Sequence, residues 1–372
     1  MKKYIIIGIM CLFSFSAAAD DKALLCQAFE IIKEKYIDEV NLSDIVVGGL
    51  KALSKEDKNI RIASEKNTAT IYYKGRLQKI FTHPWQGNDA SKWADFVINV
   101  IEGGKQISPD LRRQDFELAE VFLYEGIKAF DKNSHYYPVL EIGQEFIKPQ
   151  AYHASLHEDN ILYLRLGTIN EQTIKDFNQT MEKYQDLQGI ILDLRGNKGG
   201  YLKYALQIAD MFLNDGVMIY TTGRNKGKRN IYRATEGELY AQAPIVILVD
   251  GYTASSAEVI AMVLHEKERA ILVGSQTYGK ESVQNIYKLD NGARLALTTE
   301  RFYSAKNTSL KETSGLRPDI CTAKSETIEN FYETRSPSDN RFCPRTFNKP
   351  KEDIDIAKEL ILKQLSSVTE GK

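Results

Sequence analysis

The chain has 372 residues, of which 49 are basic and 50 acidic, so its formal net charge is −1. This length suggests two domains, or one large domain with an appendage. Hydrophobic residues make up 43% and aromatic residues 10%, which supports a sizeable core and excludes a disordered chain or a disulfide-only miniprotein. The near-neutral charge lacks the basic excess of nucleic-acid binders. The four cysteines show no C-x-x-C spacing for zinc and are too few for a disulfide scaffold.

Residues 1–19 have the pattern of a secretory signal peptide. Lysines precede an apolar run over residues 4–15, and small residues end at Ala19. The run is too short to span a bilayer, and its small-residue end suits signal peptidase. We therefore expect cleavage after Ala19 and a periplasmic or secreted protein with no stable membrane insertion. A lipoprotein is disfavoured because Met10, which precedes Cys11, is not a small residue.

Three cysteines remain beyond residue 19, namely Cys26, Cys321 and Cys343. An oxidising compartment allows disulfides to persist. Cys321 and Cys343 flank a polar segment, and closing such a loop stabilises a fold by about 3 kcal/mol in the chain-entropy model. We therefore predict this pair as the disulfide. Cys26 lies inside an apolar helix pattern and is predicted to be a buried thiol.

The first half of the chain combines helices with a short β region. Residues 22–36 place apolar side chains at spacings of three and four, which predicts an amphipathic helix. Residues 59–83 instead contain strand-like runs separated by a Lys-Gly turn signal. After Pro109, which suits a helix start, apolar residues up to Phe130 again mark one helical face.

The second half alternates between strands and helices. This alternation predicts an α/β fold with a mixed or parallel sheet whose faces are covered by helices. A further strand is expected over 293–303 and a closing amphipathic helix over 354–365. The predicted strands of the alternating region are 161–166, 190–194, 245–249 and 271–273, and its predicted helices are 171–184, 203–213 and 255–268.

Several common catalytic signatures are missing from the sequence. There is no G-x-S-x-G elbow, no S-x-x-K pair, no H-E-x-x-H zinc site and no phosphate-binding P-loop. The five histidines are scattered, and His265 would lie on a different helix face from Ser255. We therefore interpret the histidines as surface or structural residues, expect no metal or cofactor, and disfavour a Ser-His-Asp enzyme.

Ser255 and Lys280 offer a serine–lysine alternative. Ser255 follows a predicted strand and opens a predicted helix, where free N–H groups favour developing negative charge. Lys280 follows the next strand, on a turn that would approach Ser255 if the two connections are neighbours. Taken alone, these residues favour the simpler interpretation of a helix N-cap and a solvated lysine.

The surrounding motifs reverse that interpretation. The stretch from Thr253 to Glu258, followed by Thr277-Tyr278-Gly279-Lys280 and by Gln284, closely resembles the active site of the carboxyl-terminal processing peptidases, also called tail-specific proteases. The spacings of 25 residues from Ser255 to Lys280 and of 4 from Lys280 to Gln284 are those of this family. Other motifs that resemble the family's occur in order at 191–200, 222–224, 297–303 and 315–320, so the match covers about 158–321, and residues 22–53 match loosely.

The resemblance implies a serine peptidase on a crotonase-like or ClpP-like β/α core. Ser255 would be the nucleophile, Lys280 the general base and Gln284 the residue that orients the base. A serine hydroxyl becomes a nucleophile when a neighbouring base takes its proton. A lysine acts as that base only when neutral, which requires burial to lower its pKa. A neutral amide such as that of Gln284 adds no charge that would raise this pKa.

The tetrahedral intermediate of such a reaction needs backbone donors. By resemblance, these are the N–H of Ser256 and one N–H from the pair Gly199 and Gly200, which also suit a tight strand-to-helix turn. Asp193 and Arg195 are interpreted as structural partners under the sheet rather than as catalytic groups.

One departure concerns the PDZ domain that members of this family usually carry before the core. Tyr137 and Ile161 lie too close in sequence for such a domain, whereas residues 58–125 are an insert. Recognition of a substrate C-terminus by strand addition is therefore not carried over. The expected organisation is a signal peptide (1–19), a mainly helical region with an α+β insert (20–157), a catalytic core (158–325) and a C-terminal segment with a closing helix (326–372).

We therefore expect an exported serine endopeptidase that cleaves polypeptides near their C-terminal ends through an acyl-enzyme intermediate. The alternative is a catalytically silent or gated peptide-binding protein on the same fold, because the missing PDZ domain leaves room for a scaffold role. An acyl-CoA enzyme of related architecture is disfavoured, since an exported protein lacks access to that cofactor. A homo-oligomer or a regulatory partner is left open.

Overall fold

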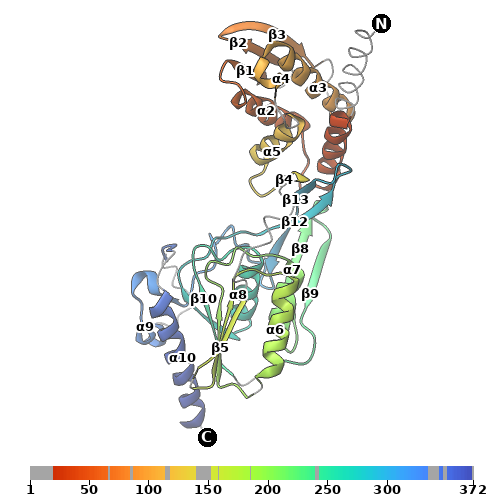
Figure 1. Ribbon diagram of the computed structural model, residues 1–372. Coiled ribbons are helices and arrows are strands. Elements are labelled where there is room, and N and C mark those ends of the chain that lie inside the picture. The colour runs from red at the N-terminus through yellow and green to blue at the C-terminus, as the bar shows by residue number, and fades with distance from the viewer. Residues whose placement is uncertain are drawn as a thin grey trace, which may run out of the picture. The chain divides into compact units, whose positions relative to one another are not determined.

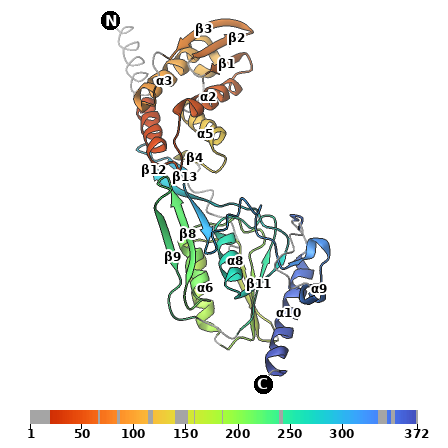
Figure 2. The same cartoon turned by 180° about the vertical axis from the view of Figure 1, so that it is seen from behind.

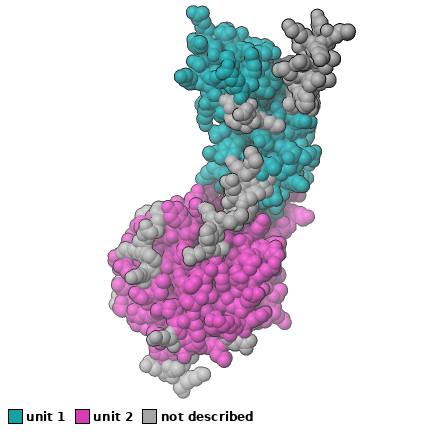
Figure 3. Space-filling model, viewed as in Figure 1, with its two compact units in different colours: residues 1–147, 284–300 teal, residues 148–283, 301–372 magenta. Residues whose placement is uncertain are grey.

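The computed structural model in Figure 1 describes residues 20–65, 68–83, 87–113, 118–139, 152–157, 159–184, 186–238, 243–333, 343–346 and 350–370. The predicted signal peptide therefore lies outside the described residues. The chain forms two compact units, coloured separately in Figure 3. The first comprises residues 1–147 and 284–300, and the second comprises residues 148–283 and 301–372. None of the described helices is long and apolar enough to cross a membrane.

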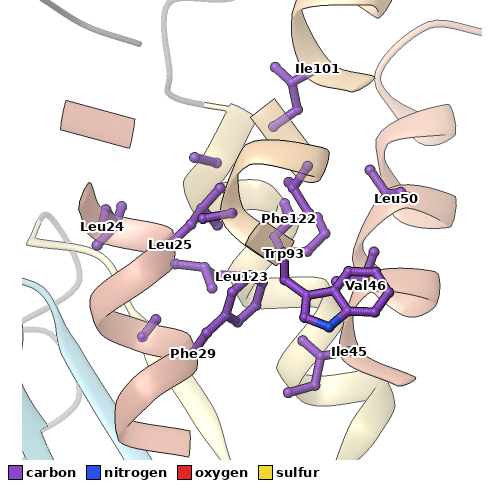
Figure 4. Close-up of a cluster of buried hydrophobic side chains, with 14 of the residues drawn as sticks. Leu24, Leu25, Phe29, Ile45, Val46, Leu50, Trp93, Ile101, Phe122 and Leu123 are labelled. Carbon is purple, nitrogen blue, oxygen red and sulfur yellow. The ribbon is translucent and has the colours of Figure 1, made fainter. Parts of the chain in front are cut away.

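Helices make up most of the first unit. The helix predicted near the start of the chain spans residues 20–35, and its Phe29 is fully buried. Phe29 meets Phe122 edge-on, with ring centroids 6.1 Å apart, inside the apolar cluster of Figure 4. Helix α2 (Leu42–Ala52) begins after Asn41, whose side chain accepts a hydrogen bond from the Ser43 N–H. The other helices of this unit are η1 (Leu53–Lys55), α3 (Ala90–Ile107), α4 (Pro109–Arg112) and α5 (Leu118–Phe130).

A three-stranded antiparallel sheet occupies the region that the sequence predicts as strand-like. Its strands β1 (Ile60–Glu65), β2 (Thr68–Tyr73) and β3 (Arg76–Thr82) are neighbours in chain order. The insert holds more structure than the expected hairpin and helix, because α3 also buries Trp93 and Val97 in the core of this unit. The spacing of four between these two residues was the signal that would have revealed α3.

Strands β12 (Ser282–Lys288) and β13 (Arg294–Ser304) are divided between the two units. Residues 284–300 belong to the first unit, where the start of β13 pairs with β4 (His135–Tyr137). The apolar side chains of Leu289 and Leu295 enter the core around Phe29. The expected catalytic core, 158–325, also contains this segment, and that range stays a prediction.

The second unit is built on a six-stranded sheet. Its strand order is β14-β11-β10-β7-β6-β5, and every neighbouring pair is parallel except β5 with β6. The predicted fold class is thereby confirmed as a mixed α/β fold with a parallel-rich sheet. The strands are β5 (Tyr152–Leu156), β6 (Ile161–Leu166), β7 (Gly189–Asp193), β10 (Ile245–Val249), β11 (Ala270–Gly274) and β14 (Ile320–Cys321).

Alternate residues of the central strands face opposite layers of helices, as the two-residue period of a strand requires. In β10, Ile247 joins the core formed with α6 (Glu171–Lys183), α7 (Leu202–Asp210) and α8 (Ser256–Glu266). The next residue, Leu248, joins the core formed with α10 (Pro350–Glu370). Figures 1 and 2 show α10 on one side of the sheet and α6 and α8 on the other. Strands covered on both faces form continuous apolar runs, which explains their accurate prediction.

Several elements of the second unit were not predicted from the sequence, among them the edge strands β5 and β14. The hairpin strands β8 (Val217–Gly223) and β9 (Arg229–Arg233) pair in antiparallel fashion, and β9 is largely exposed. An exposed strand carries no apolar alternation, so its sequence gives no strand signal. The short helices η3 (Thr322–Lys324) and α9 (Ile328–Glu333) were not predicted either.

Candidate active site

Ser255 lies at the start of α8, on the loop that follows β10. Its backbone has φ 58° and ψ −125°, a conformation that is costly for a residue with a Cβ. The loop is held by Thr253, whose hydroxyl donates a hydrogen bond to the Leu194 carbonyl at 2.9 Å. The Asp250 carboxylate accepts hydrogen bonds from the N–H groups of Thr253 and Gly196. A strained residue between a strand and a helix is a typical setting for a nucleophilic serine.

Lys280 lies on the loop between β11 and β12 and is half-buried. The Tyr278 N–H donates a hydrogen bond to the Thr253 carbonyl at 3.0 Å, so this loop is a direct neighbour of the loop that carries Ser255. The neighbourhood arises because β10 and β11 are adjacent parallel strands, whose carboxyl ends open at the same edge of the sheet.

The carboxylate of Glu258 joins these two loops. The side chain is fully buried and accepts four hydrogen bonds. Its Oε2 atom accepts from the N–H groups of Ser255 and Lys280, each at 2.9 Å. Its Oε1 atom accepts from the Thr277 hydroxyl at 2.5 Å and from the Gly279 N–H at 2.7 Å. One carboxylate oxygen therefore fixes the backbones of Ser255 and Lys280 relative to each other.

The electrostatics of Glu258 reflect two opposing influences. Burial raises the pKa of this carboxyl above its usual value, while the four donors favour the ionised form and lower it. Every partner is a donor, and an ionised carboxylate is an acceptor only. A proton on either oxygen would therefore displace one of the loop contacts.

The predicted oxyanion residues lie on the turn that follows β7. Gly199 has φ 97°, and a Cβ there would lie 2.9 Å from the Ser255 Cβ and 3.1 Å from the Ser256 nitrogen. The turn therefore passes directly beside the start of α8. The Gly199 N–H donates to the Asn197 side chain at 2.8 Å. Within the described part of the chain, the N–H groups of Gly200 and Ser256 donate to no protein acceptor.

Gln284 belongs to the first unit. There its side-chain NH₂ group donates a hydrogen bond to the Asn133 carbonyl at 2.8 Å, which fixes the direction of the amide. The predicted orienting role toward Lys280, which belongs to the second unit, stays a prediction.

Asp193 and Arg195 form a buried ionic network with neighbouring elements. The Asp193 carboxylate accepts from the Tyr163 hydroxyl at 2.6 Å and from Arg195 Nη2 at 2.7 Å. Burial raises the pKa of Asp193, but the hydrogen bonds and charge of Arg195 outweigh burial and lower it overall. Arg195 also donates to Asp353 of α10 at 2.9 Å. These contacts attach α10 to the sheet.

His265 on α8 is part of another polar contact. Its Nε2 atom lies 3.0 Å from Oδ1 of Asp319, whose Oδ2 atom accepts the Leu272 N–H at 2.7 Å. This arrangement gives His265 a structural partner that links α8 to β11. Among the described residues, no group of histidine, cysteine, aspartate or glutamate side chains is arranged to hold a metal ion.

Cys321 and Cys343 form a disulfide in the second unit. Cys26 is a free thiol that is partly rather than completely buried, in contrast to the expectation from its helix pattern. It lies beside the apolar core without entering it, because the helix 20–35 turns this residue toward the edge of its buried face. Burial nevertheless raises the pKa of its thiol.

Sequence reasoning gave no role to Glu258, Thr277 or Arg345. The first two stand inside the recognised motifs, so their fixed positions beside Ser255 and Lys280 were an available signal. Arg345 donates through Nε to the Thr277 carbonyl at 2.9 Å. It lies in a polar segment without periodicity, where no sequence pattern marks it.

Part of the chain is similar to a known protein family. Residues 160–322 match the model of Peptidase family S41. A carboxy-terminal-processing protease of Bartonella bacilliformis is 36% identical over 187 residues, which are 49% of this chain and 43% of that protein. A carboxyl-terminal-processing protease of Synechocystis is 31% identical over 182 residues, which are 48% of this chain and 42% of that protein.

Solved structures show a weaker likeness. The structure of a photosystem II D1 C-terminal processing protease matches 47% of this chain and 48% of its own, with a TM-score of 0.40 and 24% sequence identity. The chain thus spans less than half the length of the relatives named here.

Proposed function

We propose that the chain, whose residues 160–322 belong to peptidase family S41, is an exported serine endopeptidase that uses Ser255 as nucleophile and Lys280 as general base. The observation that carries this proposal is the shared acceptor Glu258 Oε2, which binds the backbone N–H groups of both residues at 2.9 Å. A nucleophile and its base must be held in a fixed mutual position to react efficiently, and a buried carboxylate with four donors supplies such a fixed point.

The chemistry proceeds in two halves. The neutral amine of Lys280 takes the proton of the Ser255 hydroxyl while the serine oxygen attacks the scissile carbonyl. The resulting tetrahedral intermediate collapses, the C–N bond breaks, and the Lys280 ammonium gives its proton to the departing amine. Lys280 then takes a proton from water, whose oxygen attacks the acyl carbon. The bond between the acyl carbon and the serine oxygen breaks, the Lys280 ammonium returns its proton to the serine oxygen, and the new carboxylic acid ionises on release.

The negative oxygen of the intermediate would be bound by backbone donors. Of the glycine pair, Gly200 is the donor that we assign, because the Gly199 N–H is already bonded to Asn197. The Ser256 N–H is the second donor, since it stands in the first turn of α8, where N–H groups lack partners within the helix. The positive end of the helix dipole favours the same oxygen.

The substrate of this enzyme would be a polypeptide that binds in extended form and is cleaved near its C-terminal end. The names of the matched relatives support this specificity. Export is supported by the Cys321–Cys343 disulfide, because disulfides persist in oxidising compartments. The orienting role of Gln284 is part of this proposal through the resemblance of its motif, and its amide is anchored on the Asn133 carbonyl.

A serine-directed phosphonate tests the nucleophile directly. We expect covalent labelling at Ser255 in the wild-type protein and none in Ser255→Ala. Ser366, an exposed serine on α10, provides the matched control, and Ser366→Ala should be labelled at the wild-type rate. Absence of labelling in folded wild-type protein, or persistent peptidase activity in folded Ser255→Ala, would contradict the proposal.

Lysine substitutions test the base. Lys280→Ala should abolish turnover of an unstructured polypeptide, and Gln284→Ala should have a weaker effect. Lys288→Ala is the control, because Lys288 is an exposed lysine on β12. A near-normal rate at neutral pH in Lys280→Ala would exclude Lys280 as the base.

A further inference from the structure

A short segment near the end of the chain, residues 343–346, is joined covalently to the sheet of the second unit. Cys343 is fully buried and forms the disulfide with Cys321. Cys321 lies in β14, directly opposite Gly274 of β11 in the parallel pair. Since β11 leads into the loop that carries Lys280, the disulfide places this segment beside that loop.

Thr346 connects this segment to both loops of the candidate site. Its carbonyl accepts a hydrogen bond from the Ser275 hydroxyl at 2.8 Å and one from the Gly251 N–H at 3.2 Å. Its own N–H donates to the Ser275 hydroxyl at 3.3 Å. Gly251 precedes Ser255 on one loop, and Ser275 precedes Lys280 on the other, so a single residue bridges the two.

Arg345 acts on the same region from the solvent side. Its Nε donates to the Thr277 carbonyl at 2.9 Å, and its Nη2 donates to the Ser314 carbonyl at 2.6 Å. The hydroxyl of Thr277 is one of the four donors to Glu258. Arg345 therefore fixes the residue whose side chain reaches the carboxylate that binds the backbones of Ser255 and Lys280.

From these contacts we propose that residues 343–346 form a disulfide-held strap that positions the loop of Lys280, with Arg345 as a positioning residue, so that the peptidase is fully active only in its oxidised form. This inference rests on the proposed function for its effect on activity. Among the described residues, Cys321–Cys343 is the covalent link between the strap and the sheet.

The redox step is an exchange with a dithiol. One thiolate of the dithiol attacks a sulfur of the Cys321–Cys343 bond, and its second thiol resolves the mixed disulfide. Two electrons and two protons pass to the cysteines, which become thiols, while the dithiol becomes a cyclic disulfide. The strap then loses its covalent link and keeps only the hydrogen bonds of Arg345 and Thr346. A protein still in a reducing compartment would therefore have a loosened lysine loop.

The test compares three forms of the full-length protein, all of which carry Cys26→Ser. Cys321 and Cys343 are then the remaining cysteines beyond residue 19, so the reductant dithiothreitol acts there on the disulfide alone. These forms are the oxidised protein, the same protein reduced and alkylated, and the oxidised Arg345→Ala variant. Arg345→Lys tests whether a single donor restores part of the effect, and Arg233→Ala is the control, because Arg233 is an exposed arginine of the same unit. The readouts are amide hydrogen exchange, the phosphonate labelling rate at Ser255, and kcat and KM.

We expect faster exchange in the peptide 275–281 of the reduced and Arg345→Ala forms, with unchanged exchange in β7 and β10. Labelling and kcat should fall about tenfold or more with little change in KM, because a small misplacement of a catalytic group is costly. Arg345→Lys should lie between Arg345→Ala and the wild type, and Arg233→Ala should match the wild type.

Two results would overturn the strap. One is unchanged exchange in 275–281 after both reduction and Arg345→Ala. The other is faster exchange throughout the second unit, which would mean that the segment only supports global stability. A wild-type protein that is neither active nor labelled would instead refute the proposed function, and the exchange experiment would still decide whether the strap exists.

Discussion

Gly199 lies directly against Ser255, since a Cβ on Gly199 would fall 2.9 Å from the Ser255 Cβ and 2.8 Å from the Ala254 carbonyl oxygen. Cβ atoms in folded proteins do not lie this close to other atoms, so a neighbouring atom would have to move. The neighbour here is backbone on both sides of the proposed nucleophile, so any side chain at position 199 must displace Ser255 itself. The presence of glycine at position 199 is therefore explained by close packing as well as by its positive φ angle.

A Gly199→Ala substitution should therefore damage both stability and reactivity. The positive φ of 97° and the close contacts together should cost about 2–4 kcal/mol of unfolding free energy, and phosphonate labelling should be lost. Gly75→Ala is a matched control, because Gly75 has a similar φ of 77° and a Cβ at that position would have no heavy atom within 4 Å. Urea unfolding and labelling rates measure both effects. Labelling of Gly199→Ala at the wild-type rate would show that the turn can move aside without loss of reactivity.

The backbone of Ser255 predicts an unusual order of stability between two inactive variants. Both Ser255→Ala and Ser255→Gly remove the hydroxyl, but only glycine also removes the Cβ that makes φ 58° and ψ −125° unfavourable. We expect Ser255→Gly to be more stable than Ser255→Ala by about 1 kcal/mol, as measured by urea unfolding. The reverse order would mean that the strain at this residue is negligible beside the entropy of a glycine in the unfolded chain.

Glu258 should be intolerant even of its isosteric amide. In Glu258→Gln, one oxygen that accepts two hydrogen bonds becomes an NH₂ group, which then faces two donors and leaves them unpaired. We expect a loss of about 2–3 kcal/mol of stability for these buried groups and a fall in kcat of about a hundredfold from misplaced loops. Steady-state kinetics and denaturant unfolding test this pair of effects, with Glu266→Gln on the same helix as control. A variant with normal kcat would mean that the loops are held by other contacts.

The contact between His265 and Asp319 should make stability depend on pH. Burial lowers the pKa of His265, but the hydrogen bond and charge of Asp319 outweigh burial and raise it above its usual value of 6.5. The stabilisation is therefore fully present below pH 6.5 and is lost as the pH rises through the higher pKa of the folded protein. Unfolding free energies of the wild type and of His265→Gln should differ most near about pH 6 and converge in alkaline solution. If the difference in unfolding free energy stays constant from about pH 5 to 9, the titration of His265 is not its cause.

The parts of the fold that the sequence predicted share a physical property. Strands β7 and β10 are buried along their whole length and β6 along most of it, so each is a largely apolar run that composition alone reveals. Strand β9 and helix α9 lie at the periphery, where tertiary contacts rather than patterning decide the structure. Residues 284–300 lie inside the expected core range 158–325, and apolar side chains of this segment pack in the first unit.

The candidate site was predictable in its identities but not in its connections. Ser255 and Lys280 were found because motif spacing is a property of the chain. The carboxylate of Glu258 joins them through backbone N–H groups, which every residue except proline possesses and no sequence pattern marks. Arg345 reaches Thr277 from 68 residues away, and a contact of that kind depends on the folded path of the chain alone.

The position of α10 has a consequence for how the protein comes into being. The face of the sheet that contains Ile161, Ile191 and Leu248 is covered by Leu360 and Ile361 of α10. A chain made from its N-terminus exposes this face until residues 350–370 have been synthesised. The core on this face of the sheet is therefore complete only once α10 has been synthesised and has packed against it.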